Sequence, residues 1–378
     1  MQKVKFKELF SFEKKSKIKA GDGFKLGEGK YPFYTSSDTL SKTLNEFLFE
    51  DESLIFGTGG LASIHHCDEK FAVSTDCFVT QPNNKKEIFA KYVYYYLSGN
   101  MHLLENGFKG AGLKHISKGY IEDLEIPLPP LATQQKIAII LDKADELRQY
   151  NKQLIEKYDA LTQSLFLEMF GDPVKNEKEW EIKELHLVAL ISSGITKGRK
   201  NNILDSIGEI PYMRVANVQD GYLDLTEIKT IPAFKTDLEK FLLKKGDVLM
   251  TEGGDPDKLG RGAVWQNEIE QCLHQNHIFK VRVDSNLLTP LYFNKLASSL
   301  YGKKYFLKIA KQTTGIATIN KTQLSKFPVL MASIDLQNQF AERVELIEIQ
   351  KQQAQEALVK SEELFQSLLQ KAFKEELV

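Results

Sequence analysis

Residues 131–170 read LATQQKIAII LDKADELRQY NKQLIEKYDA LTQSLFLEMF, a stretch without proline or glycine. Apolar or core-type residues recur along it at alternating spacings of three and four, which predicts a long helix that packs on another helix through a heptad seam. The residues expected in that seam include Ile137, Leu147, Asn151, Leu154 and Leu161. Asn151 is the polar exception, and a buried Asn often fixes the register of such a pair. Gly171, Asp172 and Pro173 predict the end of the helix.

A second stretch of the same design occupies residues 334–376. Its expected packing residues are Ile347, Ala354, Ala357, Leu364 and Leu368. Each helix would be ~60 Å long, and neither can bury its stripe alone. We therefore expect the two helices to pack on each other antiparallel within the chain. A generic dimerisation coiled coil is the alternative, and the equivalent places of the two stretches in the chain favour the intramolecular pair.

The chain repeats itself weakly but in order. Residues 5–9 correspond to residues 181–185, and residues 114–117 to residues 317–320. Each half has a loop rich in Gly and Lys, then a residue suited to N-capping (Ser117 or Asn320), a short strand with proline, and a long helix. The expected fold class is α+β, with two mixed α/β domains in a pseudo-twofold repeat, separated by two long antiparallel coiled-coil helices. The expected segments are 1–130, 131–170, 171–330 and 331–378.

Composition limits the class of protein. The chain has 378 residues, 42% of them hydrophobic, and a net charge of −1. That balance conceals a basic segment, since residues 171–330 hold 23 basic and 19 acidic side chains. A local basic face is what phosphate binding requires. Only three cysteines are present and no leader or membrane-spanning segment is evident, so we expect a cytoplasmic location.

Three stretches carry a resemblance to a known family. Residues 126–135 read IPLPPLATQQ, residues 164–173 read SLFLEMFGDP, and residues 364–373 read LFQSLLQKAF. With these motifs the chain resembles the specificity subunits of Type I restriction-modification enzymes over nearly its whole length. The second counterpart of the proline motif is degraded to FPVLMA at residues 327–332, which weakens that motif but not the architecture.

The resemblance implies a subunit that recognises DNA sequence and is not an enzyme. It implies two target-recognition domains that each read one half of a bipartite site in double-stranded DNA. The long helices would set the spacing and dock two methyltransferase subunits, which restriction subunits join. S-adenosylmethionine and ATP would belong to those partner subunits, and the chain itself would hold no cofactor or metal.

Candidate DNA contacts fall on basic and amide-rich segments, where Lys and Arg can bind phosphates or guanine and Asn can pair with adenine. In the second domain the candidates are Lys197, Arg199, Lys200, Asn201 and Asn202 in one loop, Arg261 in another, and Lys304, Lys308 and Lys311 on one helical face that leads into Gln312, Thr313 and Thr314. In the first domain they are Lys109, Lys114, His115, Lys42 and Asn45. Plain solvated surface is the alternative for each segment.

Other patterns are discounted. His65, His66 and Cys67 could suggest a metal, but neighbouring residues of a strand point to opposite faces and no second ligand pair stands at the required spacing. A self-sufficient nuclease or methyltransferase would need a catalytic motif that the sequence lacks. A structural coiled-coil adaptor is the other alternative, and it predicts no salt-dependent affinity for DNA.

Overall fold

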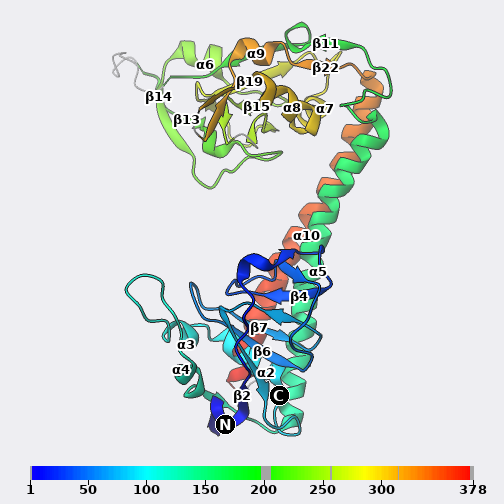
Figure 1. The fold of residues 1–378 in the computed structure, drawn as a ribbon. Helices are drawn as coiled ribbons and strands as arrows, with labels where there is room; N and C mark the ends of the chain where they lie inside the picture. Colours follow the sequence, from blue (N-terminus) through cyan, green and yellow to red (C-terminus); the bar gives the residue numbers. More distant parts are fainter. Residues whose placement is uncertain (1, 197–205, 256–257, 314, 375–378) are drawn as a thin grey trace. The chain divides into compact units, whose positions relative to one another are not determined.

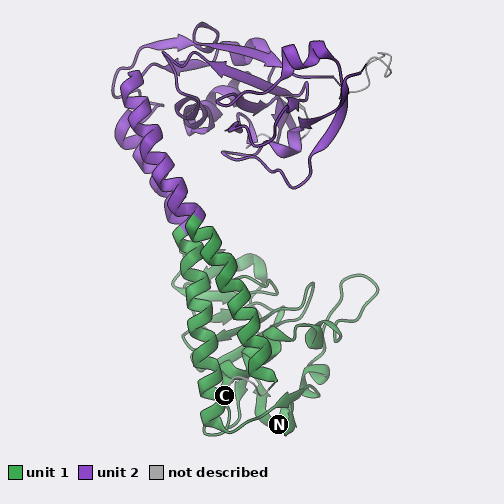
Figure 2. Ribbon diagram, turned by 180° about the vertical axis from the view of Figure 1, so that it is seen from behind, with its two compact units in different colours: residues 1–154, 353–378 green, residues 155–352 purple. Residues whose placement is uncertain are grey.

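The computed structural model describes residues 2–196, 206–255, 258–313 and 315–374. The chain divides into two compact units, which Figure 2 colours separately. Unit 1 comprises residues 1–154 and 353–378, and unit 2 comprises residues 155–352. Both boundaries fall inside the long helices α5 (Leu131–Phe170) and α10 (Ile334–Phe373), so each helix belongs partly to each unit.

Unit 1 is a mixed α/β fold whose elements are labelled in Figure 1. Its strands are β1 (Lys3–Lys5), β2 (Phe10–Phe12), β3 (Phe24–Lys25), β4 (Tyr31–Tyr34), β5 (Lys42–Leu44), β6 (Ser53–Gly57), β7 (Ile64–Cys67), β8 (Ala72–Val73), β9 (Cys77–Pro82) and β10 (Glu125–Pro127). Its shorter helices are α1 (Phe6–Leu9), η1 (Ala20–Asp22), α2 (Ala90–Gly99), α3 (His102–Glu105) and α4 (Lys118–Glu122). The main sheet has the order β2-β9-β6-β7, and a second sheet has the order β3-β5-β4-β8.

Unit 2 is also mixed α/β. Its strands are β11 (Ile182–Glu184), β12 (Ala189–Ser193), β13 (Gly208–Met213), β14 (Lys229–Ala233), β15 (Val248–Thr251), β16 (Gly253–Gly254), β17 (Gly262–Val264), β18 (Leu273–His274), β19 (Ile278–Val283), β20 (Lys311–Thr313), β21 (Ile316–Thr318) and β22 (Pro328–Leu330). Its shorter helices are η2 (Leu185–Leu187), η4 (Val215–Asn217), α6 (Lys235–Phe241), α7 (Pro290–Ser298), α8 (Leu300–Ile309) and α9 (Lys321–Ser325). The main sheet has the order β12-β19-β15-β17, the counterpart of the main sheet in unit 1.

Both units use the same strand pairing before their long helix. Strand β1 pairs antiparallel with β10, and β11 pairs antiparallel with β22. The amide of Phe6 then donates to the Leu124 carbonyl, as the amide of Leu185 donates to the Phe327 carbonyl. These pairings make Phe6 the counterpart of Leu185. The sequence alignment, which matched Leu9 with Leu185, is therefore wrong by three residues, because it followed side-chain identity where the backbone register is set by a distant strand.

The short helices α4 and α9 begin as the sequence predicts. The Ser117 hydroxyl accepts from the Tyr120 amide at 3.2 Å. The Asn320 side chain accepts from the Gln323 amide at 2.9 Å, and the Gln323 side chain accepts in turn from the Asn320 amide at 2.8 Å. These caps satisfy amides that have no partner within the helix. The prediction of both N-caps is confirmed.

A buried glutamine stands at the start of each long helix. Gln134 donates to the Glu87 and Pro129 carbonyls at 2.9 and 2.8 Å and accepts from the Phe89 amide at 2.9 Å. Gln337 occupies the equivalent place. It donates to the Leu287 and Ala332 carbonyls at 3.2 and 2.8 Å and accepts from the Thr289 amide at 2.8 Å. Through these hydrogen bonds, each glutamine links the start of its long helix, α5 or α10, to the loop that precedes the shorter helix α2 or α7 of the same unit.

The two long helices pair antiparallel within each unit. In unit 1, the Asn151 amide nitrogen lies 3.3 Å from the Ser361 hydroxyl, both side chains being buried, and Arg148 stacks over Phe365 at 4.4 Å. In unit 2, the Phe166 ring packs edge-on against Phe340 with centroids 5.7 Å apart. Ile137 and Ala354 are buried as expected, and Ile347 and Leu368 are half-buried.

Three of the leucines that the sequence assigns to the seam do not lie in it. Leu147, Leu161 and Leu364 are 45%, 48% and 46% exposed, and they do not pack between the helices. The seam passes one residue later, through Arg148, Thr162 and Phe365. A heptad seam can step by three and then four residues, or by four and then three. The leucines at 147, 161 and 364 favoured the order of steps that the structure does not have. Leu154 and Ala357 are half-buried at the border of the seam.

The cysteines are free and buried. Burial raises the pKa of the Cys77 thiol to about 11 and that of Cys272 to about 12, so both stay protonated at neutral pH. Over the described part of the chain, no helix is both apolar and long enough to cross a bilayer.

Candidate nucleic-acid interface

In unit 1, isolated β-bridges join Gly59–Gly60 to residues 109–115, and we call this arrangement the ribbon of unit 1. The Gly60 amide donates to the Lys114 carbonyl at 3.3 Å, and Gly59 forms a bridge with His115. On its other side, His115 exchanges two backbone hydrogen bonds of 3.0 Å with Lys109. Side chains of Lys109, Lys114 and His115 are all exposed. The structure therefore brings together the three basic residues that the sequence assigns to this loop.

Gly59 is needed for the approach of these strands. A Cβ at this position would lie 3.0 Å from Cε1 of His115, whose Nδ1 is 3.1 Å from the Thr58 carbonyl. The imidazole thus covers the glycine, and a larger residue would push it away.

Unit 2 holds the corresponding ribbon, β16-β21-β20. Gly253 pairs with Thr318 and Gly254 with Ala317, while Lys311 pairs with Thr318 from the other side. Lys311 is thus the counterpart of Lys109. Lys304 and Lys308, one helical turn apart on α8, are exposed just before this ribbon.

Two expectations about this segment are wrong. Helix α8 ends at Ile309, so Lys311 lies in strand β20 and not on the helical face of Lys304 and Lys308. The loop rich in Gly and Lys that the sequence predicts in this half is instead a β-hairpin that turns at Gly315, with φ of +82°. Lys311 and Gln312 are exposed in its first strand. Residues that favour strands, Thr313, Ile316 and Thr318, outweigh the helical charge pattern here.

Other candidates lie outside the ribbons. Lys42 is in β5 of the second sheet of unit 1, and its ammonium donates to the Ala20 carbonyl. Asn45 follows that strand and is exposed. Arg261 is half-buried beside β17, and its buried Nε has no hydrogen-bond partner among the described residues. Lys197, Arg199, Lys200, Asn201, Asn202 and Thr314 lie outside the described residues.

Acidic residues lie beside the glycine pair in the ribbon of unit 2. Asp255 follows Gly254 directly, and the Lys258 ammonium bonded to it holds the pKa of its carboxyl below the usual range. Glu252 precedes Gly253 and lies 2.6 Å from Nδ1 of His277. The two ribbons therefore share a backbone arrangement but differ in the charges around it.

The aliphatic tips of the ribbons are not among the residues expected from the sequence. Leu61 and Leu113 in unit 1 are 83% and 78% exposed, and Ile316 in unit 2 is 54% exposed. The available signal is an apolar residue set among glycines and lysines, as in residues 107–115. That signal is weak without the knowledge that Gly59 and Gly253 pair with these segments.

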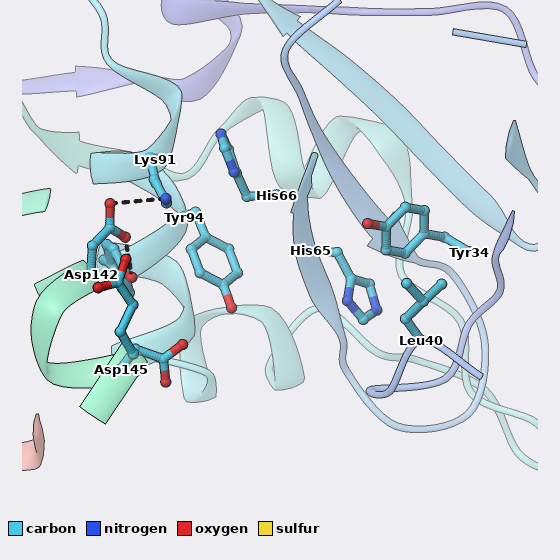
Figure 3. A pocket seen from close by; sticks show the side chains of 10 residues that line it. Tyr34, Leu40, His65, His66, Lys91, Tyr94, Asp142 and Asp145 are labelled. Carbon is cyan, nitrogen blue, oxygen red and sulfur yellow. Dashed lines mark hydrogen bonds and ion pairs between the residues drawn. The ribbon is translucent and has the colours of Figure 1, made fainter. Parts of the chain in front are cut away.

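A pocket of about 350 Å³ in unit 1 lies away from the ribbon (Figure 3). Several of its polar groups bond one another or nearby residues. The Lys91 ammonium lies 2.9 Å from Asp142, whose other oxygen accepts from the Tyr95 hydroxyl at 2.6 Å. His66 bonds Glu52 at 3.0 Å, and His65 bonds the Ser37 carbonyl at 2.8 Å. We interpret the pocket as a structural seam between the sheets and α5.

The two histidines of that pocket do not act together. His65 and His66 bond different partners, and burial lowers the pKa of His65 below its usual value. Among the residues that the structure describes, no three His, Cys, Asp or Glu side chains gather closely enough to hold a metal ion.

Comparison with known proteins agrees with the fold. Residues 1–158 match the family described as the Type I restriction modification DNA specificity domain. Beyond that match, the chain is similar to specificity subunits of Type I restriction enzymes.

Particular relatives span different shares of the chain. A putative MjaX specificity subunit of Methanocaldococcus jannaschii is 28% identical over 166 residues, which is 43% of this chain and 38% of that protein. The EcoKI specificity subunit of Escherichia coli K12 is 22% identical over 84% of this chain and 72% of its own length. The crystal structure of an S subunit from M. genitalium has the same fold, with a TM-score of 0.62 and 17% identity over 98% of this chain and 95% of that one.

Proposed function

We propose that this chain reads a bipartite target in double-stranded DNA, with unit 1 reading one half and unit 2 the other in a pseudo-twofold arrangement. The observation that carries the proposal is the pair of matched ribbons, Gly59–Gly60 with 109–115 and Gly253–Gly254 with 311–318. The hairpin of β20 and β21 in unit 2 is a two-stranded ribbon, which fits the major groove, where the base edges can be distinguished. Lysines beside the ribbons suit phosphate contacts, which set the register of a protein on the duplex.

The ribbons also support unlike half-sites. Leu61 follows the glycine pair in unit 1, whereas the acidic Asp255 follows it in unit 2. An aliphatic side chain and a carboxylate prefer different base edges. The same backbone thus presents two different reading surfaces, and the target has two different halves.

The long helices dock two methyltransferase subunits and fix the distance between the half-sites. Ile139, Leu147 and Tyr150 are exposed on α5. Leu346, Ile349 and Val359 are exposed on α10. Apolar side chains gathered on a helix surface favour a protein partner. Restriction subunits join the complex, S-adenosylmethionine binds the methyltransferase subunits, and ATP binds the restriction subunits.

Co-expression with the cognate methyltransferase subunit tests the proposal. Adenine methylation mapped across the genome of the host should show one bipartite motif with two unlike halves and a fixed gap. Replacing residues 171–330 by those of a relative should change one half only. Methylation without a motif, despite a soluble complex with an active methyltransferase subunit, would contradict the proposal and favour the coiled-coil adaptor.

A further inference from the structure

Each ribbon carries an exposed aliphatic side chain at the same place. In unit 1, Gly59 is opposite His115 and the Gly60 amide donates to the Lys114 carbonyl, and Leu113 precedes Lys114 in the chain. In unit 2, Gly254 is opposite Ala317, so the next residue on that strand is Ile316. Leu113 and Ile316 are therefore counterparts.

The backbone of the ribbon holds these side chains outward. Lys109 pairs with His115, and the loop between them turns back at Gly110, whose φ is +145°. In unit 2, Thr313 pairs with Ile316 across the turn at Gly315. Leu113 and Ile316 lie outside the buried core clusters of their units, whose members are named by their low exposure. Both side chains are thus exposed rather than part of those cores.

The neighbours of these side chains favour DNA as the partner. Leu113 adjoins Lys114 and lies near Lys109 in the ribbon, while Ile316 is in the strand paired with that of Lys311. A single exposed Leu is common on proteins and needs no partner. Aliphatic side chains at equivalent sites of two basic ribbons call for a shared partner, and base edges in the major groove offer one apolar group, the C5 methyl of thymine.

We propose that Leu113 and Ile316 are specificity-determining residues, each in contact with the C5 methyl of a thymine in its own half-site. This inference rests on the proposed function, because it assumes that each unit reads one half of the target. Leu61, which follows Gly60 in unit 1, is also exposed. Asp255 takes that place in unit 2, so the methyl contact there depends on Ile316 alone.

The test removes the methyl group and the side chain separately. The complex of the chain with its methyltransferase subunit is titrated with duplexes in which single thymines of the mapped target are replaced by deoxyuridine. At one thymine in the half-site of unit 1, this replacement should weaken binding by about three- to tenfold, as expected for the loss of one buried methyl contact. Leu113→Ala should weaken binding to the normal duplex by a similar factor and should abolish the effect of deoxyuridine.

Matched variants separate the two half-sites. Ile316→Ala should abolish the deoxyuridine effect in the half-site of unit 2 and leave it unchanged in that of unit 1. Leu113→Ile, which keeps an aliphatic side chain, should retain most of the affinity. Since Leu113 and Ile316 are exposed, none of these changes should impair folding.

The proposal is overturned if Leu113→Ala leaves the deoxyuridine effect intact, or if no thymine of a half-site is sensitive to loss of its methyl. It is also overturned if Leu113→Ala weakens assembly with the methyltransferase subunit at unchanged DNA selectivity, since the leucine would then contact protein. In each of these outcomes the bipartite motif can persist, which distinguishes failure of the inference from failure of the proposed function.

Discussion

Replacing Gln134 with Met should strongly destabilise the junction between α5 and the loop before α2. The methionine side chain has a similar length but makes none of the three hydrogen bonds of the glutamine. It leaves the Phe89 amide and the Glu87 and Pro129 carbonyls without this partner in a place that excludes water, since Gln134 is fully buried. Each such bond contributes roughly 1 kcal/mol, and an unsatisfied buried group costs somewhat more, so we expect a loss of about 3–4 kcal/mol.

Hydrogen exchange measures this loss where it occurs. The Phe89 amide donates to Gln134, and its exchange should accelerate by roughly a hundredfold to a thousandfold, because each 1.4 kcal/mol corresponds to tenfold in an opening equilibrium. Gln135→Met is the matched control, because the neighbouring Gln135 is exposed and should leave exchange unchanged. Gln337→Met should give the same acceleration at Thr289.

The reasoning fails if Gln134→Met and Gln135→Met show the same exchange at Phe89. That result would mean that the backbone groups around Gln134 find water or other partners at little cost. A loss of only about 1 kcal/mol would mean that the junction relaxes and satisfies two of the three groups in another way.

Three further predictions concern buried polar groups. Asn151→Leu removes the hydrogen bond to Ser361 but places an aliphatic residue in the helix seam. The melting temperature of the chain should therefore rise, and a fall would refute this expectation. Asp247→Ala should lower the stability of unit 2 by about 3–5 kcal/mol, because it leaves the Arg282 guanidinium without its bidentate partner. Urea denaturation measures this loss, and a change under about 1 kcal/mol would contradict the importance of the pair. Burial lowers the pKa of His274 to about 4, so the unfolded chain binds a proton that the folded unit does not, and the stability of unit 2 should fall as the pH drops from about 6.5 to 4. His274→Phe should flatten that dependence in urea titrations followed by tryptophan fluorescence, and an unchanged slope would show that another group titrates.

The helix pair shows how far a heptad pattern can be read. Ile137 and Asn151 are in the seam as predicted, because a residue at every seventh position is shared by both ways of counting. The seam residue just before Asn151 is Arg148, and a search for apolar residues at heptad spacing cannot find it because it is charged. Its aliphatic stem packs over Phe365 while its guanidinium pairs with Asp145, so a charged residue occupies a seam position without a buried unpaired charge.

The sequence indicates the residues of the ribbons but not their pairing. Lys109, Lys114 and His115 stand out as a basic cluster, and Gly59 stands out as part of a glycine pair. Their pairing joins residues more than fifty positions apart, and no local propensity encodes such a contact. The same reason explains why Lys311, which has helical spacing from Lys308, lies in strand β20. The partner of β20 is β21, which comes later in the chain and pairs in turn with the glycine pair.

Unit 1 is built from two separated pieces of chain, and this has a consequence for synthesis. Residues 353–378 leave the ribosome after all of unit 2, yet Phe365, Leu369 and Ala372 belong to the hydrophobic core of unit 1. Until they emerge, the face of α5 around Leu141 and Ala144 has no cover, although residues 155–352 can already have folded. A nonsense mutation shortly after residue 352 would therefore leave the later-encoded unit complete and the earlier-encoded one open, with its apolar surface available to chaperones and proteases.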